Sequence, residues 1–206
     1  MPGLNHVVTA FNLESLRCRV LPADSVTGLK EGDLPDAAVA VIIKSSHSTG
    51  SLLLIRRIER RDDTWSGQIA FPGGHRAPGD RSFLETAIRE ANEEVGISLN
   101  AHAVLGVLPL VYARTRRIRV VPFVFQLESG VTLRPNMEVA DAFWVRVNAL
   151  VHSKVVRSKV RVEERELTVD SYIVGENVIW GLTFRIIRVL LGENGSQFSK
   201  NLENFT

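Results

Sequence analysis

The chain has 206 residues, of which 45% are hydrophobic and 23% are charged, the composition of an ordinary globular protein. Its formal net charge of +2 is too small to indicate nucleic-acid binding, and the lone Cys18 excludes both an internal disulfide and a multi-cysteine zinc site. No apolar run reaches membrane-spanning length, and residues 1–6 lack the pattern of a signal peptide. We therefore expect a single cytoplasmic domain over residues 1–206, with its core at about 37–191 and no membrane or nucleic-acid partner.

The first predicted elements are a short amphipathic helix at about residues 10–20 and a loop at 22–35 that is rich in glycine, aspartate and proline. Two apolar runs rich in β-branched residues, 37–43 and 51–55, flank a polar turn and predict adjacent strands. A shorter apolar segment at 68–71 ends at a proline and two glycines, where we expect the strand to stop.

Helical periodicity runs over residues 80–95. Apolar residues recur there at spacings of three and four and predict one core-facing side, made of Leu84, Ala87, Ile88, Ala91 and Val95. Gly96 follows the last turn, where a left-handed C-terminal cap is expected. Either Asp80 or Ser82 is suited to cap the first turn.

The second half of the chain is predicted to contain strands at 104–112, 118–127, 143–147 and 166–174, and a helix at 178–191. Gly181 would then lie inside this helix, where glycine costs stability and would mark a close packing contact. Strands and helices are mixed along the chain without regular βαβ alternation. The pattern therefore favours an α+β sandwich over a doubly wound sheet.

Three glutamates share one face of the first long predicted helix. Glu90, Glu93 and Glu94 occupy positions i, i+3 and i+4, and crowded carboxylates repel one another unless a cation compensates them. Oxygen ligands at this density suit Mg²⁺ or Mn²⁺, which can bind phosphate oxygens and polarise a water. The carbonyl of Gly73 is a further candidate ligand, because the pair formed with Gly74 lets backbone approach closely. The alternative interpretation of the three acids is a solvated helix face without a metal.

The helix and its end read Arg89-Glu90-Ala91-Asn92-Glu93-Glu94-Val95-Gly96-Ile97, which matches the second half of the Nudix box. The chain thus resembles Nudix hydrolases. The resemblance implies an α/β/α sandwich with a mixed β-sheet between helices, and hydrolysis of a nucleoside diphosphate derivative with Mg²⁺ or Mn²⁺. It also implies that Glu90, Glu93 and Glu94 hold the metal at the catalytic centre and that Arg89 orients them through ion pairs.

The first half of the box departs from the family pattern. The acid position is filled by Asp80 rather than a glutamate, and its distance from Arg89 is one residue longer than usual. Either Asp80 or Glu85 is therefore a candidate to orient Arg89. The resemblance also implies a general base on a distant loop, for which Glu138 is the main candidate and Glu128 a weaker one, although both are ordinary loop acids by sequence alone.

Three segments resemble the coenzyme A pyrophosphatase branch of this family: 53–57, 66–74 and 178–183. That branch implies cleavage of coenzyme A or its derivatives to 3′,5′-ADP and a phosphopantetheine product. Two features depart from it, since the branch usually has a histidine near the position of Trp65 and a basic upstream motif one residue shorter. A homodimer is also implied, because many relatives are dimers.

The candidate substrate-binding residues are Arg56, Arg57, Arg61, Trp65 and Gln68. Arginines of this cluster, which also includes Arg60, suit the phosphates of a diphosphate ligand, and the indole suits an adenine ring. Two alternatives remain open from the sequence. One is a Nudix hydrolase of another nucleoside diphosphate derivative or an oxidised nucleotide, and the other is a catalytically inactive Nudix-fold binding module.

Overall fold

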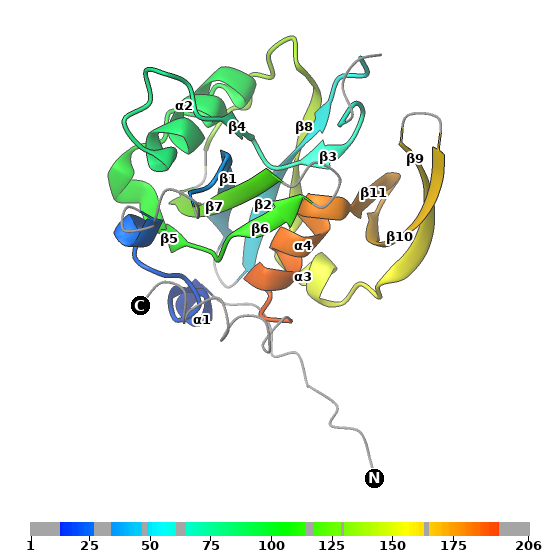
Figure 1. The fold of residues 1–206 in the computed structure, drawn as a ribbon. Coiled ribbons are helices and arrows are strands. Elements are labelled where there is room, and N and C mark those ends of the chain that lie inside the picture. The colour runs from blue at the N-terminus through cyan, green and yellow to red at the C-terminus, as the bar shows by residue number, and fades with distance from the viewer. Residues whose placement is uncertain are drawn as a thin grey trace.

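The computed structural model describes residues 13–26, 34–46, 49–60, 65–113, 118–128, 130–162 and 165–193. Within them the helices are α1 (Leu13–Arg17), α2 (Phe83–Val95), α3 (Val147–Val151) and α4 (Gly181–Leu190), with short 3-10 turns at Ala23–Val26 and Ala101–Ala103. The larger sheet is formed by β1 (Ala37–Ser46), β2 (Thr49–Arg57), β3 (Ile69–Ala70), β4 (Gly73–His75), β5 (Val104–Val107), β6 (Val111–Ala113), β7 (Ile118–Leu127) and β8 (Val139–Arg146). A smaller sheet contains β9 (Val156–Val162), β10 (Arg165–Val174) and β11 (Asn177–Trp180) (Figure 1).

The larger sheet is mixed, as expected. β1 pairs in parallel with β7 along one edge and antiparallel with β2 along the other. β2 in turn pairs antiparallel with β8, and β7 pairs antiparallel with β5 and β6. The continuous apolar runs that predicted β1 and β2 are typical of strands with both faces covered.

Residues of β1 alternate between two apolar layers. Ala38, Ala40 and Ile42 pack in the layer that contains the buried face of α2. Val39 and Val41 pack in the opposite layer, which contains the apolar face of α4. Figure 1 shows the two helices on opposite sides of the strands, so the predicted α/β/α sandwich is confirmed.

The β3–β4 segment is inserted between β1 and β2 where these strands separate. β1 and β2 pair only over residues 43–46 and 49–52, and beyond this point β2 pairs with β3 while β1 pairs with β4. The backbone N–H of Ala40 donates to the carbonyl of Pro72 over 2.8 Å at the middle of the segment. The Gly73-Gly74 pair is thereby held inside the sheet, beside α2.

Several details of the second half of the chain differ from the sequence prediction. The segment 104–112 forms two strands, β5 and β6, because Pro109 between them has no backbone N–H to donate to a ladder. Residues 178–180 belong to β11, and α4 starts at Gly181, since a short apolar run suits a strand as well as a helix. Strand β9 was not predicted.

The expected role of Gly181 was also wrong. This glycine has a φ of 64° at the start of α4, and an added Cβ would have no neighbour within 4 Å. Its function is therefore to turn the chain from β11 into the helix, rather than to permit a close packing contact.

Both ends of α2 follow the sequence prediction. The Oγ of Ser82 accepts a hydrogen bond from the backbone N–H of Glu85 over 3.2 Å, and Gly96 closes the helix at a φ of 70°. The described part of α1 lies within the helix expected at about residues 10–20. Among the described residues, no helix combines the length and hydropathy that a membrane crossing requires.

Candidate active site

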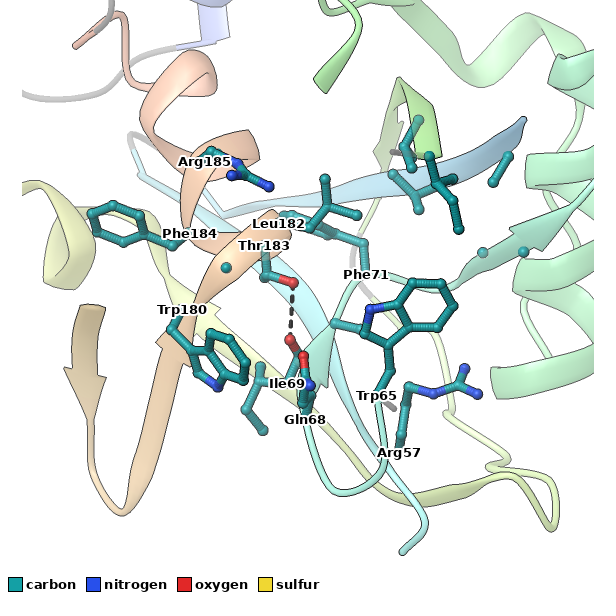
Figure 2. A pocket seen from close by; sticks show the side chains of 18 of the residues that line it. Arg57, Trp65, Gln68, Ile69, Phe71, Trp180, Leu182, Thr183, Phe184 and Arg185 are labelled. Carbon is teal, nitrogen blue, oxygen red and sulfur yellow. Dashed lines mark hydrogen bonds between the residues drawn. The ribbon is translucent and has the colours of Figure 1, made fainter. Parts of the chain in front are cut away.

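A cavity of about 710 Å³ opens between α2, the β3–β4 segment, α4 and the β9–β10 hairpin. Glu90 and Glu94 reach it from α2, and Glu138 reaches it from the loop before β8. Gly73 and Gly74 form part of its wall. Figure 2 shows the neighbouring part of the wall, to which the β3 region and α4 contribute. Residues far apart in the sequence thus surround one space of the size that binds small ligands.

Asp80, rather than Glu85, holds Arg89. The Nε and one terminal nitrogen of Arg89 donate to the two carboxylate oxygens of Asp80, each over 3.0 Å. Asp80 is only 8% exposed, and these bonds lower the pKa of its carboxyl to about 2, with further help from the N–H of Ala77 and the hydroxyl of Thr86. Glu85 instead pairs with Arg81 on the surface.

The other terminal nitrogen of Arg89 connects two of the predicted catalytic acids. It donates to Oε1 of Glu90 and to Oε2 of Glu93, each over 2.9 Å. Glu90 lines the cavity, whereas the Glu93 side chain is 53% exposed and does not contribute to the lining. Arg89 therefore links the buried Asp80 to Glu90 and Glu93, and the role of Arg89 in orienting metal ligands stays a prediction.

Glu94 is the most deeply buried acid of the three. It is 2% exposed, and its Oε2 accepts a hydrogen bond of 2.9 Å from the backbone N–H of Gly73. Burial raises the pKa of its carboxyl to about 7, and the nearby negative charges of Glu90 and Glu138 act in the same direction. Burial also raises the pKa of Glu90. The negative charges of Glu90, Glu94 and Glu138 at this end of the cavity are therefore only partly neutralised by nearby positive groups.

The two glycines of β4 allow the close approach expected from the sequence. A Cβ on Gly73 would overlap the carbonyl oxygen of Ala38 and would lie 2.6 Å from the Cα of Val39. A Cβ on Gly74 would lie 2.5 Å from Oε1 of Glu90. The lack of a side chain therefore lets Gly73 lie against β1 and lets Gly74 lie against the Glu90 carboxylate.

Replacing Gly74 by alanine is expected to lower kcat/KM by about a hundredfold, because the new methyl group displaces the Glu90 carboxylate by about an ångström. Stability should change by less than about 1 kcal/mol, since a flexible side-chain end can move aside. Initial rates and thermal unfolding check both values. Gly79→Ala is the matched control, because its Cβ would meet nothing within 4 Å. Equal rates for the two variants would contradict the proposed contact.

Three of the five candidate substrate-binding residues line the cavity: Arg57, Trp65 and Gln68. Trp65 and Arg57 are both drawn among the lining side chains in Figure 2. Arg56 does not reach this cavity, because alternate residues of β2 face opposite sides, and its guanidinium donates to Oδ1 of Asn177 over 2.7 Å. Arg61 lies outside the described residues.

The two candidate bases differ in position. Glu138 lines the cavity with a side chain 47% exposed, and its Oε1 lies 3.5 Å from a guanidinium nitrogen of Arg60. Glu128 follows the end of β7, is exposed and is not part of the lining. The structure thus favours Glu138 of the two, although its role in proton transfer stays a prediction.

Comparison with known proteins decides the family. A profile of the NUDIX domain matches residues 34–167, more than half of the chain. The chain belongs to the Nudix family. The segment that carries the acids, Gly73 and Arg89 falls within the matched residues, and the hydrolase relatives described next support a pyrophosphohydrolase activity.

Two curated relatives are Nudix hydrolases. The protein named "Uncharacterized Nudix hydrolase NudL" of Pectobacterium atrosepticum is 36% identical over 157 residues, which cover 75% of this chain and 80% of the relative. The human "Mitochondrial coenzyme A diphosphatase NUDT8" is 31% identical over 179 residues, which cover 82% of this chain and 72% of the relative. A crystal structure of a MutT/nudix family protein from Enterococcus faecalis has 18% sequence identity and a TM-score of 0.50. The match covers 92% of this chain and 76% of that protein's chain, and it supports the fold alone.

Nudix hydrolases generally use divalent metal ions such as Mg²⁺, and the acidic end of this cavity suits one. The carboxylate oxygens of Glu90 and Glu94 are hard donors. Burial disfavours the charged form of both groups, and a bound cation would compensate that charge. In the part of the chain that the structure describes, no three acidic, histidine or cysteine side chains converge as a complete ligand group. The assignment of Gly73, Glu90, Glu93 and Glu94 as metal ligands therefore stays a prediction.

The part of the cavity wall of this Nudix protein that lies outside α2 and the β3–β4 segment was not predicted from the sequence. That wall comes from α4 and the β9–β10 hairpin, and Thr183 fastens it to β3 by donating to the carbonyl of Ile69 over 2.8 Å (Figure 2). Thr183 is 5% exposed. The alternation of valine with arginine and lysine in 156–162 was a strand signal that could have located the hairpin.

Proposed function

We propose that this Nudix hydrolase cleaves the diphosphate of coenzyme A or its derivatives, producing 3′,5′-ADP and a phosphopantetheine product, with Mg²⁺ or Mn²⁺ bound. The observation that carries the proposal is one cavity that is lined by the buried Glu94, the partly buried Glu90, Arg57 and Trp65. These groups suit a divalent cation, a diphosphate and an adenine ring. The human relative named a coenzyme A diphosphatase supports the choice of substrate.

The proposed reaction divides its tasks between a bound metal ion and the side chains around it. A cation held by Glu90, Glu94 and the carbonyl of Gly73 would neutralise phosphate charge and activate a water. Arg89, fixed by Asp80, keeps the Glu90 carboxylate in position. Hydrolysis would join a water oxygen to one phosphorus atom and break the bond between that phosphorus and the bridging oxygen, which leaves with the other phosphate group.

Arg57 is placed to contact the diphosphate, because its guanidinium lies 3.8 Å from the Glu94 carboxylate at the acidic end of the cavity. Trp65 lines the same cavity and offers a flat apolar surface for the base. Glu138 lines the same cavity and is the acid we assign to accept the proton of the attacking water. The binding of the nucleotide and the proton transfer are thus both assigned to the side of the cavity that contains the acids.

A substrate panel tests the proposal. Coenzyme A, ADP-ribose, a diadenosine polyphosphate, a nucleotide sugar and an oxidised nucleoside triphosphate are each incubated with the protein and Mg²⁺. We expect kcat/KM for coenzyme A to exceed the other values by at least about tenfold, the discrimination that a single pocket contact provides. Excess EDTA should abolish turnover. An intact coenzyme A pool, with another compound hydrolysed, would contradict the proposal, and no turnover at all would favour the binding module.

Replacing Glu138 by glutamine is expected to lower kcat by about a hundredfold to ten-thousandfold, because general-base catalysis contributes in that range. Its side chain is about half exposed, so thermal stability should stay within about 0.5 kcal/mol of the unmodified protein. Initial rates with coenzyme A and thermal unfolding measure the two effects. The control is Glu128→Gln, outside the cavity lining, and the assignment fails if this variant loses as much activity as Glu138→Gln.

The homodimer implied by the resemblance also stays a prediction. Light scattering at micromolar concentration would test it directly.

A further inference from the structure

The loop that carries Glu138 is bonded to the end of α2, the helix that carries the other acids. The backbone N–H of Arg134 donates to the carbonyl of Val95 over 2.8 Å, and the N–H of Asn136 donates to the carbonyl of Glu94 over 3.0 Å. These carbonyls belong to the last two residues of α2 and have no partner within the helix itself. Two backbone hydrogen bonds therefore hold this loop against the helix close to the acidic end of the cavity.

Asn136 makes three of the hydrogen bonds that give this loop its shape. Besides the bond to α2, its side-chain Oδ1 accepts from the backbone N–H of Glu138 over 2.8 Å, and its carbonyl accepts from the N–H of Val139 over 3.2 Å at the start of β8. An asparagine that bonds the backbone two residues ahead forms an Asx turn. Met137 inside the turn is 81% exposed, so the turn is held by Asn136 rather than by packing of the intervening side chain.

The backbone of Glu138 is held on both sides. Its N–H donates to Asn136, and its carbonyl accepts from the N–H of Ile58 over 2.9 Å. The side chain is held less firmly, because its contact with the Arg60 guanidinium spans 3.5 Å between two side chains that are each about half exposed. The direction of the Glu138 carboxylate therefore depends mainly on its backbone, and Asn136 supplies the side chain that fixes this backbone.

We propose that Asn136 is a positioning residue of the reaction, which holds the backbone of Glu138 so that its carboxylate faces the attacking water. The inference rests on the proposed function, which assigns the proton transfer to Glu138. Asn136 does not line the cavity, so it acts through another residue. Because its own N–H is bonded to the last turn of α2, it also fixes the place of Glu138 relative to Glu90 and Glu94 on that helix.

Replacing Asn136 by alanine removes the acceptor for the N–H of Glu138 and leaves the backbone groups of the loop in place. A displacement of about an ångström at a reacting group can cost about a hundredfold in rate, so we expect kcat to fall by about ten- to a hundredfold. KM should stay within about twofold, because the lost interaction serves the transition state rather than substrate binding. Asn136→Ser keeps an oxygen acceptor in the same turn without adding charge, and its kcat should recover to within about fivefold of the unmodified protein.

A double-mutant cycle distinguishes positioning from a general structural effect. The change Asn136→Ala is made in the unmodified protein and in Glu138→Gln, and kcat is measured with the best substrate of the panel described above. If Asn136 acts through Glu138, the alanine substitution should change kcat by less than about twofold in Glu138→Gln. An equal fall in both backgrounds would overturn the inference, because the asparagine would then act on another part of the site.

The matched control is Asn100→Ala. Asn100 makes the same kind of local bond, in which its Oδ1 accepts from the backbone N–H of Ala103 over 3.0 Å, but its 3-10 turn lies outside the cavity lining. Each alanine variant loses one such bond, so both should lower the melting temperature by about 2–4 °C. Only Asn136→Ala should lower kcat, and an equal fall in kcat for the two variants would contradict a positioning role.

The outcomes also separate this inference from the proposed function. An unchanged kcat in Asn136→Ala, with the expected loss in Glu138→Gln, rejects the positioning role alone. Full activity of Glu138→Gln rejects the assigned base and the positioning role together. Cleavage of a nucleotide derivative other than coenzyme A rejects the proposed substrate, and the cycle measured with that compound still decides the role of Asn136.

Discussion

Replacing Glu94 by glutamine is expected to reduce turnover by about a thousandfold or more. The substitution removes the buried carboxylate at the acidic end of the cavity and keeps the hydrogen-bond acceptor for the N–H of Gly73. Loss of about 4 kcal/mol of transition-state stabilisation, which a bound metal ion can provide, corresponds to that factor. Hydrolysis of coenzyme A at saturating Mg²⁺ measures it, and unchanged turnover would show that the activity arises elsewhere.

The same substitution is expected to stabilise the metal-free protein at pH 8. Burial raises the folded-state pKa of Glu94 from 4.5 to about 7, so the protonated carboxyl is the form favoured by folding. The stability that it contributes is fully present below pH 4.5 and is lost as the pH rises through about 7. At pH 8 the charged carboxylate therefore costs up to about 3 kcal/mol, which the neutral glutamine avoids.

Urea unfolding in EDTA at pH 5 and pH 8 checks this sign. The unmodified protein should lose stability between the two values, and Glu94→Gln should lose less. Glu93→Gln is the matched control on the same helix, because the Glu93 side chain is 53% exposed, and its stability should stay within about 0.5 kcal/mol. Parallel pH profiles for the unmodified protein and Glu94→Gln would contradict the argument.

Replacing Asp80 by asparagine is expected to destabilise the protein by about 3 kcal/mol, because it leaves the guanidinium of Arg89 without its bidentate partner at a nearly buried position. It should also lower kcat/KM, since Glu90 is held in place by the same arginine. Urea unfolding at pH 7 and initial rates measure the two effects.

The pH dependence of this pair has the opposite sign from that of Glu94. Hydrogen bonds from Arg89 lower the pKa of Asp80 from 3.8 to about 2 in the folded state, so its contribution is present above pH 3.8 and is lost as the pH falls through about 2. The contribution amounts to about 2 kcal/mol. The control is Glu85→Gln, which removes only a surface pair with Arg81 and should cost less than about 1 kcal/mol. Equal losses in the two variants would reject Asp80 as the anchor of Arg89.

Local patterns predicted those elements whose signal does not depend on distant residues. The helix around Glu90 was predicted together with its Gly96 cap, because its apolar period and its cap are both determined by neighbouring residues. The first two strands were predicted because a sheet covered on both faces requires continuous apolar runs. A short apolar run does not distinguish a strand from a helix, and residues 178–180 were placed in a helix although β10 pairs with them as a strand.

The sequence by itself determined the chemistry of one side of the site: the spacing of Glu90, Glu93 and Glu94, the arginine before them and the glycines of β4. Only the tertiary structure decided which acid holds Arg89, because Asp80 and Glu85 are both within reach along the chain and only the fold of the loop before α2 brings one of them against the guanidinium. The tertiary structure alone also joined α4 and the β9–β10 hairpin to the cavity, since contacts between segments a hundred residues apart leave no mark in local periodicity.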